Sequence, residues 1–240
     1  MKAKNRKTMA NKELSFWEHL DELRSVLIKS ICAWVVVFIA AFCLKDWIFA
    51  WLLKPLGNNQ TLVNIDVTGQ FMTHIQVSLC IGFVIALPLI IYWLYGFVAP
   101  ALYAQEKRHT GIFLICSILL FAAGVTLNYF LVFPLSFRFL TLYEVSPVVE
   151  NHISLSSYIS LLVVLSILMG LLFEVPVVTW ILSSLGILRR EYMQKYRRHV
   201  FVGILILAAV ITPTGDPFTL LLVTMPVYLL YELSIWIIKT

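Results

Sequence analysis

Long runs without a formal charge constrain this chain more than any other feature of its sequence. Phe71 to Ala99 contains no Asp, Glu, Lys or Arg, and neither does Gly111 to Phe137. About 20 apolar residues in a helix are enough to cross the hydrocarbon core of a bilayer, which is about 30 Å thick. Charged residues make up only 13% of the chain, about half the share that is usual in a soluble domain. These observations predict an integral membrane protein.

Further apolar runs divide the chain into a basic arm, residues 1–14, and a single all-α domain, residues 15–240, with six transmembrane helices. The expected spans are Val26–Leu44, Phe71–Ala99, Gly111–Phe137, Tyr158–Leu188, Val200–Ile211 and Phe218–Ile238, with far-side loops at 55–70 and 138–156. We expect Pro88 to kink the second span, and Glu174 with Pro176 to interrupt the fourth, because proline removes a helical hydrogen bond.

The last two spans are expected to be short. Val200–Ile211 would form only about 18 Å of helix at 1.5 Å per residue. Pro226 and Glu232 are expected to break the last span. Such a hairpin needs either a thinner bilayer or a polar cavity beside it. The mismatch therefore predicts a concave bundle.

The positions of the cationic residues predict the orientation. Of the 18 Lys and Arg, only Lys45, Lys54 and Arg138 lie on one side of the expected spans. All the others lie in the N-terminal arm and first helix, in the loops near 100–110 and 186–199, or at the C-terminus. The positive-inside rule places both termini in the cytoplasm. The pI of about 9.0 is then explained by topology, and binding of nucleic acid is not expected.

The sequence contains no arrangement of residues typical of an enzyme. Its five histidines are scattered, without the H-E-x-x-H spacing of a zinc site, and no glycine-rich phosphate loop or nucleophile elbow occurs. The four cysteines lie within or beside apolar runs, where they are expected to act as small packing residues. We therefore expect no catalytic residue, no metal site and no cofactor.

Three acidic features remain as candidate sites. Glu18 and Glu22, four residues apart with Asp21 beside them, lie on the cytoplasmic side of the first helix, near Arg24. They form either a solvated acidic face or a docking site for a cationic ligand. Glu106, in the next cytoplasmic loop, either pairs with its cationic neighbours or joins such a site. Glu174 lies within an apolar span, where an ionisable group is costly and usually faces a cavity or a partner. A protonated packing role is the alternative.

Five short strings of the sequence resemble the TatC family, the receptor subunit of the twin-arginine protein translocase. They are His19-Leu20-Asp21-Glu22-Leu23-Arg24, Ala99 to Tyr103 followed by Glu106-Lys107-Arg108, Phe173-Glu174-Val175-Pro176-Val177, Thr212-Pro213, and Leu230-Tyr231-Glu232. The strings occur in the family's order, and the resemblance runs from about Phe16 to the end of the chain.

This resemblance implies a function. TatC proteins bind the twin-arginine signal peptide of folded precursor proteins at the cytoplasmic face. They scaffold export driven by the protonmotive force, together with TatA-type and, where present, TatB-type single-span subunits. The resemblance also implies a multi-pass protein of the bacterial cytoplasmic (inner) membrane that self-associates in a larger complex.

The resemblance further assigns roles to individual residues. Glu22 and Glu106 would recognise the signal, because two guanidinium groups call for two carboxylates in bidentate geometry. Arg24 would help to shape this site, and Phe97 would contact the apolar part of the signal. Glu174 would face the concave groove.

The chain departs from the family pattern at three positions. Val26 stands where the family often has a second basic residue, one extra residue precedes Asp216, and Leu220 replaces a glutamine found in some members. Thr212 is then the remaining candidate for a polar contact with a partner. Two other functions are considered: a proton-coupled small-molecule transporter using Glu174, and a membrane-embedded enzyme. The first lacks the internal repeats of many transporters, and the second lacks a catalytic constellation.

Overall fold

The computed structural model describes residues 16–56, 61–98, 110–143, 146, 152–184, 186–212 and 215–238. The predicted basic arm, residues 1–14, and the predicted site residue Glu106 lie outside these ranges. The described helices are α1 (Phe16–Cys43), α2 (Lys45–Leu52), the 3₁₀ turn η1 (Lys54–Leu56), α3 (Gly69–Val98), α4 (Thr110–Leu127), the π-helical segment η4 (Asn128–Val132), α5 (Phe133–Leu142), α6 (Leu155–Phe173), α7 (Val175–Ser184), α8 (Arg190–Lys195), α9 (Arg197–Ile211) and α10 (Pro217–Ile237).

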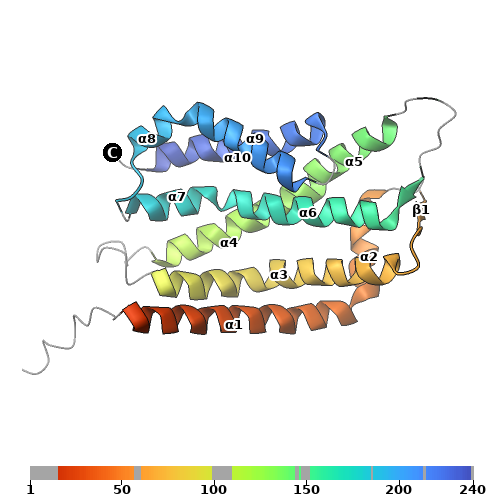
Figure 1. Ribbon diagram of the computed structural model, residues 1–240, viewed down its shortest axis with the longest axis horizontal. Helices are drawn as coiled ribbons and strands as arrows, with labels where there is room; N and C mark the ends of the chain where they lie inside the picture. The colour runs from red at the N-terminus through yellow and green to blue at the C-terminus, as the bar shows by residue number, and fades with distance from the viewer. Residues whose placement is uncertain are drawn as a thin grey trace, which may run out of the picture.

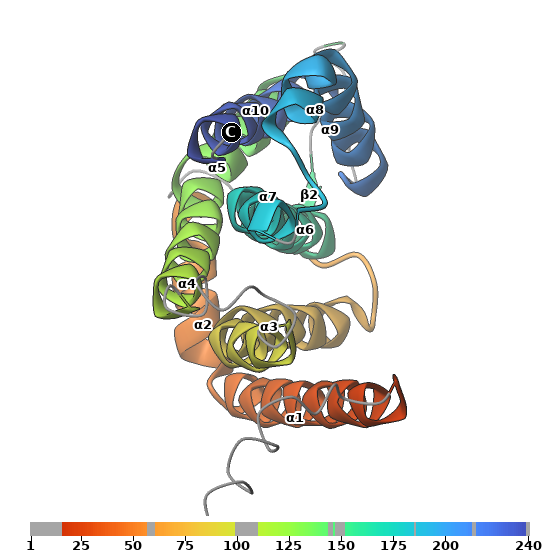
Figure 2. The ribbon, with the colours of Figure 1, turned by 90° about the vertical axis from the view of Figure 1, so that its left-hand side faces the viewer.

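The long helices run side by side and form a curved bundle. The start of α1, the end of α7, the start of α9 and the end of α10 all lie at one end, which we call the basic end (Figure 1). Seen from this end, α1, α3, α4, α5, α10 and α9 follow an arc, and α6 with α7 lies on its inner side (Figure 2). This arrangement confirms the predicted concave, all-α membrane bundle.

Five helical segments are long and apolar enough to cross a bilayer. They are Leu20–Cys43, Gly69–Phe97, Gly111–Leu142, Leu155–Ser184 and Pro217–Trp236. The sixth segment, α9, has 15 residues and is about 22 Å long, so it is shorter than a normal span. The prediction of a short final hairpin is confirmed for this helix.

Helices α1 and α3 pack against each other along most of their length. Gly82 permits the close approach, because a Cβ there would lie 3.0 Å from the backbone nitrogen of Phe38. The indole Nε1 of Trp34 donates a hydrogen bond to the carbonyl of Leu79 at 3.0 Å. Helix α3 continues through Pro88 without a break, and the kink expected at that residue stays a prediction.

At the other end, which we call the far end, α2 turns across the bundle (Figure 1). Its last carbonyls are satisfied from neighbouring helices: Tyr129 donates to the carbonyl of Trp51 at 2.6 Å, and Tyr158 to that of Leu52 at 2.9 Å. Two short parallel strands, β1 (Leu62–Val63) and β2 (Ile153–Ser154), join the two far-end loops. Neither strand was predicted.

The third span differs from its predicted form. It was expected to end at Phe137, but the helix continues through α5 to Leu142, so the loop expected from residue 138 begins later. Arg138 is exposed in the structure, and a side chain of this length can reach the water at a membrane surface. The π-helical segment η4 precedes Pro134, the proline in the first turn of α5. Proline lacks an N–H and clashes with the carbonyl four residues earlier, and a π-helical turn is one way to absorb this.

The fourth span forms the core of the bundle. Its predicted interruption is confirmed, because α6 ends at Phe173, Glu174 is a turn residue, and Pro176 lies in the first turn of α7. The hydroxyl of Ser154 caps the start of α6 by accepting from the N–H of Ser157 at 3.1 Å. Eleven of the 19 residues of helix α6 are buried, since α3, α4 and α10 all pack against it.

The predicted break in the last span is wrong. Helix α10 runs from Pro217 to Ile237 through both Pro226 and Glu232. Neighbouring groups often compensate a proline within a transmembrane helix. The charge of Glu232 is balanced by Arg197 of α9, which lies 2.9 Å away, so this residue does not end the helix.

Candidate functional site

The first candidate group lies at the basic end, on α1 and α3. Glu22 is in the second turn of α1 and is partly buried, whereas Arg24 is exposed. Glu22, Val26 and Ser30 recur at intervals of four and therefore share one face of the helix. Val26 and Ser30 are buried, and α1 packs mainly on α3. Glu22 consequently lies on the side of α1 that faces the bundle.

Phe97 comes from the neighbouring helix. It is partly buried, one residue before the end of α3. Because α1 and α3 run in opposite directions, the start of one and the end of the other meet at the basic end (Figure 1). The structure therefore places Glu22, Arg24 and Phe97 at the same end of two packed helices, while Glu106 is not described.

The second candidate is Glu174, at the turn between α6 and α7. Ser117 of α4 donates a hydrogen bond of 2.5 Å to Oε2 of Glu174. The other carboxyl oxygen, Oε1, is buried and has no hydrogen-bond partner among the described residues. Glu174 lies about 15 Å of helix from Ser184, the end of this span. Only one of its two carboxyl oxygens is hydrogen-bonded among the described residues, and the residue lies within a membrane span. Ionisable residues in such positions are usually functional.

A second polar contact, which we did not predict, joins the same two spans, Gly111–Leu142 and Leu155–Ser184. Asn128 in η4 is fully buried, and its Nδ2 donates to Oγ of Ser166 at 2.8 Å. Ser166 in turn donates to the carbonyl of Leu162 at 2.7 Å. An asparagine inside an uncharged run was the signal for this contact, but sequence position alone does not show which serine it meets.

Two glycines lie between these polar contacts. A Cβ on Gly124 would lie 2.6 Å from the carbonyl oxygen of Met169, and one on Gly170 would lie 2.5 Å from the ring of Phe121. Helices α4 and α6 therefore approach closely here. We call this contact, from the Ser117–Glu174 pair to the Asn128–Ser166 pair, the α4–α6 seam.

The third candidate is Thr212, at the end of α9. The residue is only 5% exposed, and its Oγ1 has no hydrogen-bond partner among the described residues. After it, Gly215 adopts a positive φ of 57°, and Asp216 caps α10 by accepting from the N–H of Thr219 at 2.7 Å. Leu220 packs against the main core.

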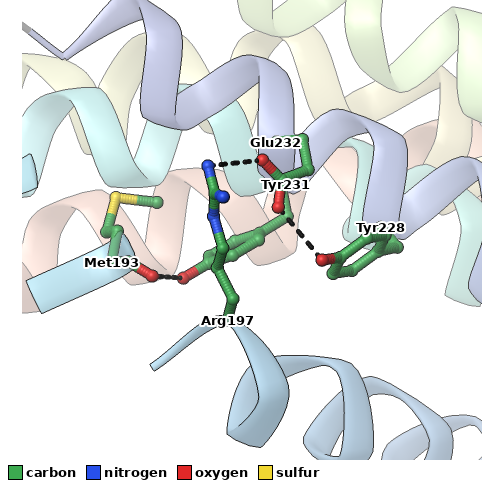
Figure 3. Close-up of polar contacts among 5 residues, drawn as sticks. All are labelled: Met193, Arg197, Tyr228, Tyr231 and Glu232. Carbon is green, nitrogen blue, oxygen red and sulfur yellow. Dashed lines mark hydrogen bonds and ion pairs between the residues drawn. The ribbon is translucent and has the colours of Figure 1, made fainter. Parts of the chain in front are cut away.

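A charged cluster at the basic end joins α9 to α10, and the sequence did not indicate it (Figure 3). Arg197, the first residue of α9, forms an ion pair of 2.9 Å with Glu232. Tyr228, one turn earlier in α10, donates to the other oxygen of Glu232 at 3.0 Å. We call Arg197, Tyr228 and Glu232 the clasp. Tyr231 donates to the carbonyl of Met193 in α8 at 2.8 Å. Among the described residues, no group of three or more His, Cys, Asp or Glu could hold a metal ion.

The arc of long apolar helices defines a multi-pass helical membrane protein. Residues 18–226 match the family described as Sec-independent protein translocase protein (TatC). The chain belongs to the TatC family. It is therefore a component of a protein translocase, which implies a complex with other subunits.

Relatives and solved structures agree with this assignment. The TatC protein of Carboxydothermus hydrogenoformans is 36% identical over 96% of this chain and 95% of its own. TatC of Escherichia coli is 34% identical over 91% of this chain and 85% of its own. A crystal structure of the twin-arginine translocase receptor TatC in DDM matches with a TM-score of 0.84 and 35% identity, covering 93% of this chain and 100% of that one.

Proposed function

We propose that this chain is the receptor and scaffold subunit of a twin-arginine translocase. It binds the twin-arginine signal peptide of folded precursors at its basic end, which faces the cytoplasm. The observation that carries the proposal is the position of Glu22, on the face of α1 directed into the bundle and at the same end as Phe97. The similar solved structures are described as a twin-arginine translocase receptor, which supports it.

The chemistry of the ligand explains this choice of residues. Two adjacent guanidinium groups are bound best by two carboxylates, because each pair forms parallel charge-assisted hydrogen bonds. Glu22 supplies one carboxylate and Glu106 the other. Arg24, exposed two residues after Glu22, repels a misplaced guanidinium and so helps to set its position. Phe97 offers an apolar surface to the hydrophobic part of the signal.

Other features fit the same role. The bacterial cytoplasmic (inner) membrane is the proposed location, since the charge distribution places both termini in the cytoplasm. The partners are TatA-type and, where present, TatB-type single-span subunits, further copies of this chain and the lipid bilayer. Glu174 provides a polar group that faces the concave groove. The end of α9 around Thr212 contributes to partner docking. Recognition and assembly of this kind require binding differences alone, so no enzymatic step is proposed.

Peptide binding by the purified protein in nanodiscs tests the proposal. Glu22→Gln and Glu106→Gln should each weaken binding of a twin-arginine peptide by about tenfold or more, the cost of losing a charge-assisted hydrogen bond. Asp21→Asn is the matched control, because Asp21 is the exposed neighbour of Glu22, and it should leave binding nearly unchanged. A peptide with Lys-Lys should bind more weakly than one with Arg-Arg. Equal affinity for both peptides, or equal loss in all three variants, would refute the site.

The alternative function, a proton-coupled small-molecule transporter, depends on Glu174. Its carboxyl is bound on one side by Ser117, a contact that stabilises a fixed position. Proton-coupled uptake of a solute by this chain alone in liposomes would support that alternative, and its absence there is expected.

A further inference from the structure

Helices α3 and α4 diverge toward the far end. They lie side by side at the basic end, and α4 then runs away from α3 toward α5 and α10 (Figures 1 and 2). Between them lies a cavity of about 330 Å³, which we call the α3–α4 cavity. Leu162, Val163 and Ser166, all buried residues of α6, form its floor. Its volume falls within the range of ligand pockets, about 300–1,000 Å³.

The α3–α4 cavity opens on the outer side of the arc. Helix α6 lies on the inner side of the arc, and α3 and α4 lie on the arc itself (Figure 2), so a cavity with its floor on α6 opens away from the concave groove. The rim consists of the exposed residues Trp51, Thr126 and Phe130. Phe130 is 70% exposed and belongs to the span Gly111–Leu142. The opening therefore faces the acyl chains of the bilayer.

The interior of the cavity offers little to water. Most of the residues that line it are apolar, and the hydroxyls among them are already used. Tyr129 donates to the carbonyl of Trp51 at 2.6 Å, and Ser166 donates to the carbonyl of Leu162 at 2.7 Å. A buried water needs two to four polar partners. An apolar occupant is therefore favoured.

The size of the cavity decides between an acyl chain and a helix. Two turns of a helix about 10 Å wide occupy on the order of 800 Å³, more than twice the volume of the cavity. A water molecule takes up about 30 Å³, and a methylene group is of similar size, so the cavity holds about ten methylenes of one chain. Its side on α3 runs from Val77 to Val84. These residues lie about 12 Å and about 22 Å of helix from Gly69, the first residue of α3, the depth of an acyl chain below its headgroup.

A cation lies beside the opening. Lys54 follows α2, and its Nζ is 3.5 Å from the centre of the ring of Trp51, which is a rim residue. The side chain is exposed and forms no ion pair with another described residue. An ammonium group has three N–H donors and binds phosphate as a point charge. Tryptophan and lysine are both typical of the level of lipid headgroups.

We propose that the α3–α4 cavity binds one glycerophospholipid from the leaflet at the far end, with one acyl chain between α3 and α4 and its phosphate at Lys54. The lipid fills the gap that the diverging helices leave. It also supports α2, whose last carbonyls are held by Tyr129 and Tyr158. The site is independent of the signal-peptide site, because Glu22 lies at the basic end of the bundle.

Photo-crosslinking in nanodiscs tests the position of the acyl chain. The probe is a phosphatidylglycerol that carries a diazirine near the middle of one acyl chain, and the full-length chain is used. Adducts are expected on Leu162 and Val163, which are only 3% and 5% exposed and so are out of reach of lipid that surrounds the bundle. Labelling confined to exposed positions of α3, such as Ile85 and Leu89, would show surrounding lipid only and would overturn the inference.

Variants that fill the cavity sharpen this test. Ile81→Trp and Val84→Phe enlarge two half-buried residues that line it, and each should lower labelling of the floor about tenfold or more. Ile85→Trp is the matched control, because Ile85 lies one turn after Ile81 and is 57% exposed, and it should leave the labelling unchanged. Unchanged binding of the twin-arginine peptide shows that each variant is folded. Floor labelling that persists in both filled variants would contradict the proposal.

A second comparison tests the headgroup. Lys54→Gln should lower floor labelling by the phospholipid about threefold, as expected for an exposed charge. Lys45→Gln, which changes another exposed lysine of the far end, should have no effect. A fatty-acid methyl ester with the same diazirine but no phosphate should label the floor more weakly than the phospholipid, and equally in the original chain and in Lys54→Gln. Equal labelling by the ester and the phospholipid in the original chain would show that Lys54 does not select phosphate, and would refute the site.

Discussion

The α4–α6 seam and the α9–α10 hairpin are two helix pairs held together in different ways. In the seam, glycines bring the backbones close, and polar side chains meet deep within the bundle. In the hairpin, one helix exposes an apolar face, and the polar contacts lie at the basic end. Close packing and buried hydrogen bonds favour one arrangement of two helices. The ion pair between Arg197 and Glu232 in the hairpin is partly exposed, so salt and substitution can weaken it.

The largest expected effect concerns Gly124. Gly124→Ala should lower the free energy of unfolding by about 2–3 kcal/mol, the usual cost of overpacking, because the new Cβ meets the backbone carbonyl of Met169. Gly170→Ala should cost less, since its new Cβ meets a side chain, the ring of Phe121, and not the backbone. Gly203→Ala on α9 is the control, as nothing lies within 4 Å of its Cβ, and it should be neutral or slightly stabilising. Thermal unfolding followed by tryptophan fluorescence measures all three, and equal effects would remove the contrast between the two pairs.

The next effect separates function from stability within the seam. Glu174→Leu should insert and fold normally but reduce export of a twin-arginine precursor by about tenfold, equivalent to 1.4 kcal/mol. Ser117→Ala should reduce export less, because it removes only one donor to Glu174. The measurement is the rate of export in inverted membrane vesicles, with the amount of inserted protein as the control. Unchanged export in Glu174→Leu would support a packing role for this acid.

A smaller effect is expected from the other polar contact of the seam. Ser166→Ala leaves the amide of the fully buried Asn128 without its acceptor. The free energy of unfolding should therefore fall by about 1 kcal/mol. Asn128→Leu combined with Ser166→Ala should recover most of this loss, because no unpaired polar group then remains. If the double variant is less stable than Ser166→Ala, Asn128 has a role besides this hydrogen bond.

The smallest effect is a response to salt. The clasp is partly exposed, so about 1 M salt should weaken it by less than about 1 kcal/mol. Hydrogen exchange should then rise at the start of α9 but not in the seam. A matching rise in α4 and α6 would show that salt acts on the whole bundle and not on the clasp.

Much of the fold follows from local sequence. The uncharged runs predict the spans, and Glu174 with Pro176 predicts the break between α6 and α7. The errors have local causes too. Arg138 was taken as the start of a loop, but a long cationic side chain near a membrane surface reaches water while its backbone stays helical. Glu232 was taken as a break, but a partner on another helix balances its charge.

The candidate site was only partly predictable. Glu22 and Phe97 were recognised from motifs, and antiparallel packing of neighbouring spans is enough to bring them to one end. The Asn128–Ser166 contact and the clasp were not, because helix periodicity does not specify which faces of two distant helices meet. Thr212 was expected to contact a partner, and it is buried in the structure. Its role in docking therefore stays a prediction that concerns the surface around it.

The sequence by itself determined the class of protein and the order of its membrane segments, and it predicts their orientation. These properties depend on the free energy of transferring each segment from water to lipid, which is set by the residues of that segment. Only the tertiary structure decided the register of α4 on α6, the pairing of Arg197 with Glu232 and the position of α6 inside the arc. Those features depend on how closely two backbones approach and how each helix is rotated about its axis, which is decided by packing between segments far apart in the chain.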